Sequence, residues 1–113
     1  MSTHEPDLSL IFQALSDPTR RAMLARLGKG AVAVSDLAEP TGLRLPTVLR
    51  HLSVLEEARL IETEKQGPVR MCRAVPESLV VANQWLEERR AEWEARTDRL
   101  EAFLESLEDG NED

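Results

Sequence analysis

The segment over residues 34–60, VSDLAEPTGLRLPTVLRHLSVLEEARL, restricts the fold of this chain more than any other part of it. Ser35 is a residue type that caps helices, so it predicts a short helix over Asp36–Pro40. Gly42 tolerates the positive φ of a tight turn and separates this helix from a second one. Together these features predict a helix-turn-helix over residues 34–58.

The second helix of this segment is amphipathic and is predicted to run from about Leu45 to Ala58. Val48, Leu52 and Leu55 are spaced four and three residues apart, so they share one buried face. The other positions leave an exposed basic face. A helix of this kind fits the major groove of double-stranded DNA, and we therefore expect this helix to read an operator.

Two further helices are predicted over residues 8–33. The first covers Leu8–Leu15, and its apolar face consists of Leu8, Ile11, Phe12 and Leu15. Asp17 is expected to cap the second, with Pro18 at its first position, where a missing N–H costs little. This helix ends near Leu27, before a glycine-rich stretch, and its apolar stripe consists of Ala22, Met23 and Leu27.

A β-hairpin is predicted over residues 60–75, directly after the helix-turn-helix. Leu60–Lys65 and Val69–Val75 both alternate as half-buried strands do, and turn residues separate them. We call this hairpin the wing. The predicted fold class is therefore mainly α with a small β-hairpin, a winged helix-turn-helix.

A helix of about thirty residues is predicted over residues 76–107. Apolar side chains recur along it at seven-residue intervals, and we call this row the seam: Leu79, Leu86, Trp93, Leu100 and Leu107. Phe103 and Leu104 widen it near its end. Such a row is too apolar to leave in water, so it predicts a homodimer whose interface also includes Leu8 and Phe12. The alternative, which is compatible with a dimer, is packing of the seam onto the chain's own first helices.

The length of 113 residues fits a single domain, with residues 1–7 and 108–113 disordered. We expect no signal peptide and no membrane contact, because the chain lacks a long apolar run. The single cysteine, Cys72, fits a reducing compartment, so we expect a cytoplasmic protein.

The net charge of -7 is unevenly distributed along the chain. Residues 1–40 have a balance of -1. Residues 41–75 carry six basic and four acidic side chains, a balance of +2, whereas residues 76–113 carry four basic and twelve acidic ones, a balance of -8. The basic middle third favours contact with phosphate groups. The acidic last third either orients the basic side toward DNA or is a solvated helix surface.

Residues 12–21, FQALSDPTRR, begin a series of short motifs. The others are Asp36–Ala38, Gly42–Leu43, Pro46–Val48, Arg50–Leu52, Val54–Glu56, Leu60–Ile61, Gly67, Trp85–Leu86 and Trp93. This series, over residues 8–106, resembles the ArsR/SmtB-type winged-helix repressors, and its last part is similar to the subgroup without metal sites. The resemblance implies a homodimeric transcriptional repressor that binds a palindromic operator and is released by an inducer.

On this fold, the start of the second helix of the helix-turn-helix faces base edges, and later positions face phosphates. We predict DNA contacts by Arg44, Thr47, Leu49, Arg50 and His51. Arg50 pairs with a guanine or holds a phosphate. Leu49 reads a thymine methyl unless it packs in the core, and His51 reaches a phosphate unless it caps a helix or packs against the wing. Arg44 stands where the family often has a capping serine, which weakens the helix start.

In the wing, Lys65, Gln66 and Arg70 are predicted to reach the minor groove or the phosphates beside it. The alternative is that they are ordinary solvated side chains. Arg20 and Arg21 begin the second predicted helix. We expect one of them to contact a phosphate, and a structural role to dominate for at least one.

The residues do not favour metal sensing. A thiolate site before Asp36 requires a C-x-C motif, and the matching positions hold Ala33 and Ser35. The last helix has no histidine for a zinc site. Cys72 lacks a second thiol for a reversible switch, so a buried apolar role is the better interpretation. We therefore expect no metal and no cofactor.

Catalytic residues are not expected either, because the chain has no nucleophile–base pair and no phosphate loop. Two alternatives to the metal-independent repressor stay open. One is a winged helix that binds another protein instead of DNA. The other is a repressor released by a small organic ligand near the dimer helices, bound by aromatic side chains that otherwise belong to the core: Trp85, Trp93 and Phe103.

Overall fold

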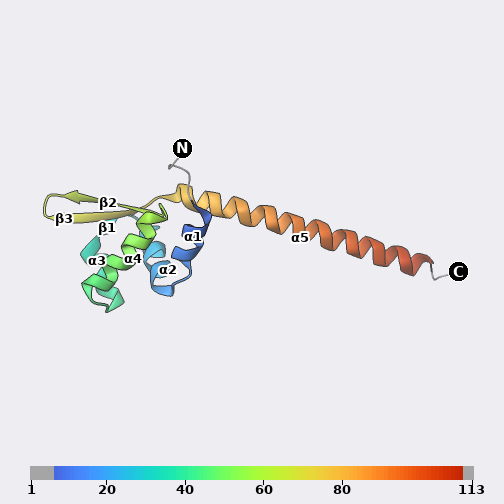
Figure 1. Ribbon diagram of the computed structural model, residues 1–113, viewed down its shortest axis with the longest axis horizontal. Helices are drawn as coiled ribbons and strands as arrows, with labels where there is room; N and C mark the ends of the chain where they lie inside the picture. Colours follow the sequence, from blue (N-terminus) through green and yellow to red (C-terminus); the bar gives the residue numbers. More distant parts are fainter. Residues whose placement is uncertain (1–6, 111–113) are drawn as a thin grey trace. The chain divides into compact units, whose positions relative to one another are not determined.

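The computed structural model describes residues 7–110, which contain a winged helix-turn-helix. Its elements are α1 (Leu8–Leu15), α2 (Pro18–Leu27), β1 (Val32–Ala33), α3 (Val34–Ala38), the 3-10 helix η1 (Glu39–Thr41), α4 (Leu45–Glu57), β2 (Ile61–Gln66), β3 (Val69–Ala74) and α5 (Pro76–Gly110) (Figure 1). Two compact units divide the chain, one ending at Ala82 and one beginning at Asn83. The predicted fold class is confirmed.

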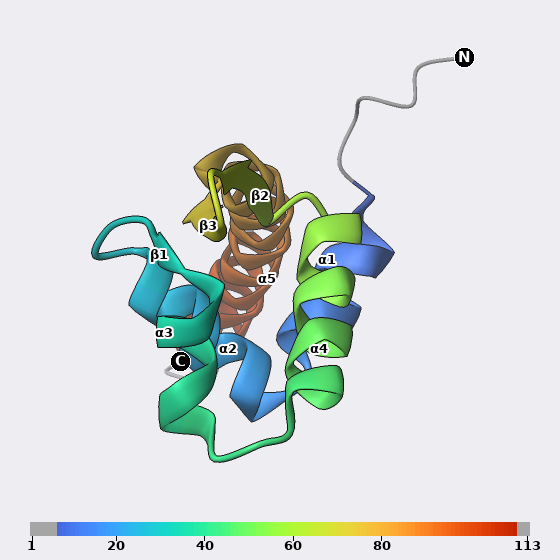
Figure 2. The ribbon, with the colours of Figure 1, turned by 90° about the vertical axis from the view of Figure 1, so that its left-hand side faces the viewer.

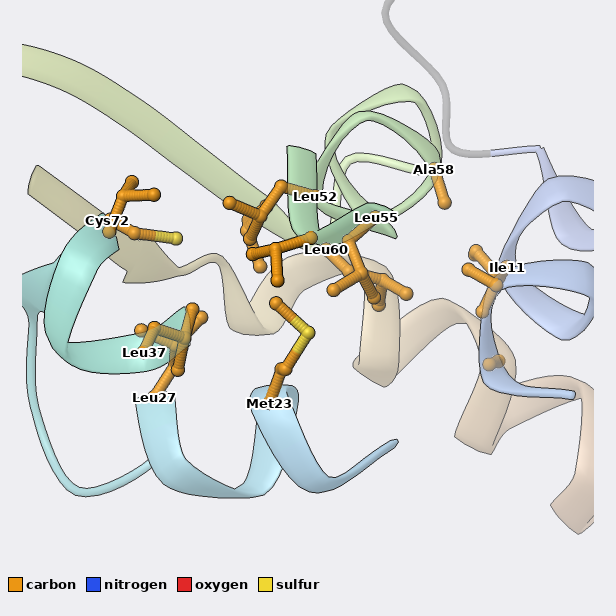
Figure 3. Packing of buried hydrophobic residues seen from close by; sticks show 14 residues of the cluster. Ile11, Met23, Leu27, Leu37, Leu52, Leu55, Ala58, Leu60 and Cys72 are labelled. Atoms are coloured by element: carbon orange, nitrogen blue, oxygen red, sulfur yellow. The ribbon is translucent and has the colours of Figure 1, made fainter. Parts of the chain in front are cut away.

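The core of the first unit forms between helices and sheet, and α4 contributes its predicted face. Val48 and Leu55 are fully buried, and Leu52 is nearly so. Figure 2 shows α1 beside α4, and α2 also contacts α4. In Figure 3 the side chain of Met23, on α2, points toward Leu60. Other members of this buried cluster are Ile11, Ala14, Leu27, Val34, Leu37, Ala58, Ile61, Cys72 and Ala82.

The sheet has three antiparallel strands in the order β1-β3-β2. Strands β2 and β3 form the predicted wing, paired from Ile61↔Ala74 to Gln66↔Val69. Gly67 has a φ of 63°, which a residue without a Cβ adopts at no steric cost in the two-residue turn. Strand β1 was not predicted, because two residues are too short to show an alternating pattern.

The start of α3 differs from the prediction. The helix begins at Val34, and its N-cap is Ala33, which has no side-chain oxygen, so Ser35 does not cap it. Two forces replace the cap. Pairing of Ala33 with Met71 in the sheet holds the backbone extended up to this point, and Val34 turns its side chain into the core, where it is 7% exposed.

The ends of the other helices agree more closely with the sequence. Asp17 caps α2, accepting a hydrogen bond from the amide of Arg20 at 3.1 Å, with Pro18 at the predicted position. The stripe of α2 is narrower than predicted, because Ala22 is exposed. Asp7, predicted as disordered, caps α1. Residues 1–6 and 111–113 lie outside the described part of the chain.

Helix α5 continues to Gly110, so residues 108–110 are helical and not disordered as predicted. Leucine and glutamate both favour helices, and Gly110 is the first helix-disfavouring residue after this run. The core-facing side of its first turns is also displaced from the seam. Ser78 and Ala82 are buried, and the Ser78 hydroxyl donates to the carbonyl oxygen of Arg59 at 2.7 Å, whereas Leu79 is 39% exposed.

The seam residues are exposed in the described chain. The five side chains of the seam, together with Phe103 and Leu104, range from 39% exposed at Leu79 to 65% exposed at Trp93. Of the other two predicted interface residues, Leu8 is half-buried and Phe12 is 37% exposed. No described helix is both long and apolar enough to cross a bilayer.

The two faces of α4 offer a matched test of this core. Leu55→Ala removes a fully buried side chain, so we expect the free energy of unfolding to fall by about 2–5 kcal/mol. Leu49→Ala makes the same change at a side chain that is 45% exposed, and should cost less than about 0.5 kcal/mol. Urea unfolding followed by circular dichroism measures both. Equal losses would contradict the described orientation of α4.

Candidate nucleic-acid interface

The turn that leads into α4 is fixed by Thr41 as well as by Gly42. The Thr41 hydroxyl donates to the carbonyl oxygen of Ala38 at 2.6 Å and accepts from the amide of Leu43 at 3.1 Å. Gly42 has a φ of 68°, as the turn prediction required. The contribution of Thr41 was not predicted. These contacts set the point at which α4 leaves the turn.

The exposed side of α4 carries four of the five residues nominated on it. Arg50 lies about half a helical turn from both Val48 and Leu52, so it points away from the core. Arg44 and Leu49 are also exposed, and Thr47 is half-buried. The core alternative for Leu49 is therefore wrong. Arg44 is the N-cap residue of α4 and makes no side-chain capping bond, in line with the weakened cap expected there.

His51 is largely enclosed by the start of α2. Its side chain is 15% exposed, and Nδ1 lies 3.1 Å from Nη1 of Arg20 and 4.0 Å from Oδ2 of Asp17. Because a guanidinium only donates hydrogen bonds, Nδ1 accepts and the proton of the neutral ring is on Nε2. The imidazole therefore has a packing role of the kind held open for it, against α2 and not against the wing.

Both arginines that begin α2 bind the end of α1. Arg20 donates from Nε to the carbonyl oxygen of Ala14 at 2.8 Å and from Nη2 to that of Gln13 at 3.0 Å. Arg21 donates from Nη1 to the carbonyl oxygen of Leu15 at 2.8 Å. The last carbonyls of a helix lack partners within it, so these contacts satisfy them. The structural role expected for at least one arginine holds for both.

The wing is tied to α4 by a chain of hydrogen bonds. Arg70 donates to the hydroxyl of Thr63 at 2.8 Å, and that hydroxyl donates to Oε1 of Glu56 at 2.8 Å. Lys65 pairs with Arg70 across the hairpin, on the face that carries Thr63. Lys65 and Gln66 are exposed at the end of β2. The structure thus separates an anchored Arg70 from a more open wing tip.

A shallow groove of about 300 Å³ separates α4 from the wing. Leu49 and Arg70 line it from opposite sides, with Ser53 and Glu56 between them. The groove brings together nominated residues that are distant in sequence. His51, in contrast, contacts α2, so the nominated set does not form a single cluster.

Metal and thiol chemistry can be assessed over residues 7–110. Within them, no group of three or more histidine, cysteine, aspartate and glutamate side chains is arranged to hold a metal ion. Cys72 is fully buried, and burial, with a smaller effect of the Glu56 carboxylate, raises its pKa to about 11. The thiol is therefore protonated at neutral pH and unreactive. The interpretation of Cys72 as a buried apolar side chain is confirmed.

Comparison with known proteins identifies the family. A helix-turn-helix domain family matches residues 15–64. A crystallised ArsR family transcriptional regulator, RHA00566, is 46% identical, with a TM-score of 0.74 over 77% of this chain and 90% of that one. The chain belongs to the ArsR family of transcriptional regulators. The resemblance given by the motifs from Phe12 onward is thereby confirmed.

Two further relatives of this ArsR family member are similar over most of their length. The HTH-type transcriptional regulator Rv2034 of Mycobacterium tuberculosis is 41% identical over 80 residues, which are 70% of this chain and 73% of the relative. The arsenical resistance operon repressor of Staphylococcus xylosus is 35% identical over 81 residues, which are 72% and 78% of the two chains. Both are regulators of transcription by name, and neither is an enzyme.

The capping bond of Asp17 predicts how this ArsR protein responds to acid. The hydrogen bond from the Arg20 amide, followed by the charges of His51 and Arg20, lowers the pKa of Asp17 below its usual 3.8. A carboxylate with a lowered pKa stabilises the fold above its ordinary pKa, and this stabilisation is lost as the pH falls through the folded value. Asp17→Asn keeps a capping oxygen but does not titrate. We expect it to lose less stability than the wild type between about pH 5 and about pH 2.5.

Urea unfolding midpoints at the two pH values measure this difference. Asp98→Asn, an exposed position on α5, is the matched control and should show the same acid response as the wild type. An Asp17→Asn variant that loses as much stability as the wild type on acidification would contradict the role of the charged cap.

Proposed function

We propose that this chain is a homodimeric transcriptional repressor that binds a palindromic operator through α4 and the wing, and that it does not respond to metal ions. The observation that carries the proposal is the position of Arg50. It is exposed on the side of α4 directed away from Val48 and Leu52, so the helix presents a guanidinium to any groove that it enters. Arginine pairs bidentately with guanine or holds a phosphate.

The other nominated contacts fall into two groups. Arg44, Thr47 and Leu49 are on the first turns of α4, where base edges are read, and Leu49 offers a methyl surface to thymine. Lys65 and Gln66 are placed to follow the adjacent minor groove, and Arg70 supports the wing from its contact with Thr63. We assign His51 a smaller part, because only its Nε2–H remains to donate to a phosphate.

Homodimerisation is supported by the exposed seam. Leucines and a tryptophan at seven-residue spacing need a partner helix to leave water, and a second copy supplies an identical row. Two copies related by a twofold axis read two half-sites in opposite directions, which is why we propose a palindromic operator. The family name of the staphylococcal relative supports repression as the outcome of binding.

We propose one functional domain over residues 1–113 with four parts. These are the helices over 8–33, the helix-turn-helix over 34–58, the wing over 60–75 and a dimerisation helix from 76 onward. The distal part of α5 forms a separate compact unit, but a single helix has no core of its own. Its stability therefore depends on packing against another surface.

Independence from metal ions rests on the available ligands. The chain has one cysteine, and that thiol is buried and protonated. Thiolate sites require deprotonated, accessible sulfur. The carboxylates of α5 are bonded to Arg89 and Arg90 in part, and carboxylates alone select zinc poorly.

Arg50→Ala tests the assignment of α4. We expect operator binding to weaken by about 1–3 kcal/mol, because the arginine contributes a base or phosphate contact. Arg99→Ala removes the same charge from an exposed position on α5 and should bind as the wild type does. Both variants should remain dimers in sedimentation experiments. Wild-type affinity of Arg50→Ala would show that α4 does not read DNA through this residue.

The function as a whole is tested by fluorescence anisotropy with the DNA upstream of this protein's own gene, beside a scrambled duplex and across a salt series. We expect binding to the upstream DNA to be at least roughly a thousandfold tighter, and to fall steeply with salt. Added zinc or arsenite should leave the affinity unchanged. Equal weak binding to both duplexes would favour the protein-binding alternative, and loss of binding with metal would overturn metal independence.

A further inference from the structure

The distal segment of α5, Asn83–Gly110, leaves four seam residues uncovered. Leu86, Trp93, Leu100 and Leu107 are between 49% and 65% exposed. On a straight helix, a row with a strict seven-residue repeat drifts slowly around the axis. Two such rows stay in contact only where the helices wind around each other, as in a coiled coil.

A second column completes the contact surface of this segment. The column four residues after the seam consists of Asn83, Arg90, Thr97 and Leu104. The column three residues after it contains two arginines, Arg89 and Arg96, whose burial would cost more. The single arginine of the first column, Arg90, already pairs with Glu87 of its own chain at 2.8 Å. The first column therefore lies in the contact, and Arg89 and Arg96 lie at its edge.

The two edges of this surface carry opposite charges. Immediately after each seam residue of the segment comes a glutamate, and this row consists of Glu87, Glu94, Glu101 and Glu108. The other edge carries Arg89 and Arg96. Positions that point away from the seam include Ala91, Ala95 and Ala102, which are small helix formers suited to a solvated face. One edge is thus acidic and the other is basic.

Edge charges decide the direction of pairing. In a parallel pair of helices, the basic edge of one copy faces the acidic edge of the other, so Arg89 faces Glu94 and Arg96 faces Glu101 of the second copy. In an antiparallel pair, each edge faces its own kind, and the contacts are Arg–Arg and Glu–Glu. We propose that this segment of α5 pairs in parallel and in register with a second copy of itself. The inference rests on the proposed homodimer and adds its orientation.

The position of Arg96 supports this arrangement. Its guanidinium carbon lies 5.7 Å from the centroid of the Trp93 ring, so the charge stays beside the seam. Within residues 7–110, neither Arg96 nor Glu101 forms an ion pair. They are five residues apart, a spacing that places them on different sides of one helix. A second, parallel copy brings this arginine and this glutamate together across the contact.

Cysteine cross-linking of the full-length protein tests the direction. In a parallel, in-register pair, identical seam positions face each other, so Leu86→Cys and Leu100→Cys should each form a covalent dimer under mild oxidation. Ala95→Cys, on the outer face, is the matched control and should stay uncross-linked. The wild type controls for Cys72, which is fully buried. In an antiparallel pair, at most one of the two seam variants meets its own copy.

Charge reversal gives a second readout of opposite sign for the two directions. Arg96→Glu places a glutamate against Glu101 of a parallel partner, so we expect the dimer dissociation constant to rise about tenfold. In an antiparallel pair the same change replaces an Arg–Arg contact and tightens the dimer. Arg99→Glu, which points away from the seam, should change the constant less than about twofold.

The outcomes separate this inference from the proposed function. Cross-linking of both seam variants and a weaker Arg96→Glu dimer support parallel pairing. A wild-type dimer that binds its operator, but in which only one or neither seam variant cross-links, overturns the parallel arrangement and leaves the repressor intact. A tighter Arg96→Glu dimer does the same. A wild type that sediments as a monomer overturns both.

Discussion

The orientation of α4 about its own axis depends on the burial of three side chains. Val48, Leu52 and Leu55 occupy one side of the helix and enter the core, which leaves Arg50 no direction except outward. A change of one residue in this spacing would rotate the guanidinium toward the sheet or toward α2. The exposed surface of the helix is therefore a consequence of its hidden one.

A second constraint joins α4 to the N-terminal helices. The Arg20 guanidinium binds two carbonyl oxygens at the end of α1 and the imidazole of His51 at the same time. Three helices thus share one planar group with fixed donor directions. The corner between α1 and α2, which also holds the Asp17 cap, lies against α4 through polar contacts with defined geometry, in addition to apolar packing.

Much of this fold follows from the sequence, because its signals are local. The α4 stripe, the Asp17 cap and the turn at Gly42 each depend on a few adjacent residues. The parts that could not be predicted depend on distant partners. Strand β1 exists because β3 pairs with it, and α3 starts one residue early because the sheet and the core hold Ala33 and Val34.

The candidate site shows the same division. The exposure of Arg50 and Leu49 follows from helical periodicity, whereas the partners of His51 and Arg70 come from other elements. The acidic end of the chain also has a clearer meaning in the structure. Several glutamates of α5 pair with Arg89 and Arg90 on the same helix, so part of that charge is neutralised locally. This favours the solvated-helix interpretation for those residues.

The composition of β2 has a consequence for how copies of this protein meet. In the order β1-β3-β2, both outer strands have an unpaired backbone edge, and open edges invite sheets of neighbouring molecules to join. Strand β1 is only two residues long, and β2 carries charges at Glu62, Glu64 and Lys65. Edge-to-edge stacking is thus disfavoured at both margins. The sheet resists aggregation, and contacts between copies are directed to the apolar helical surfaces.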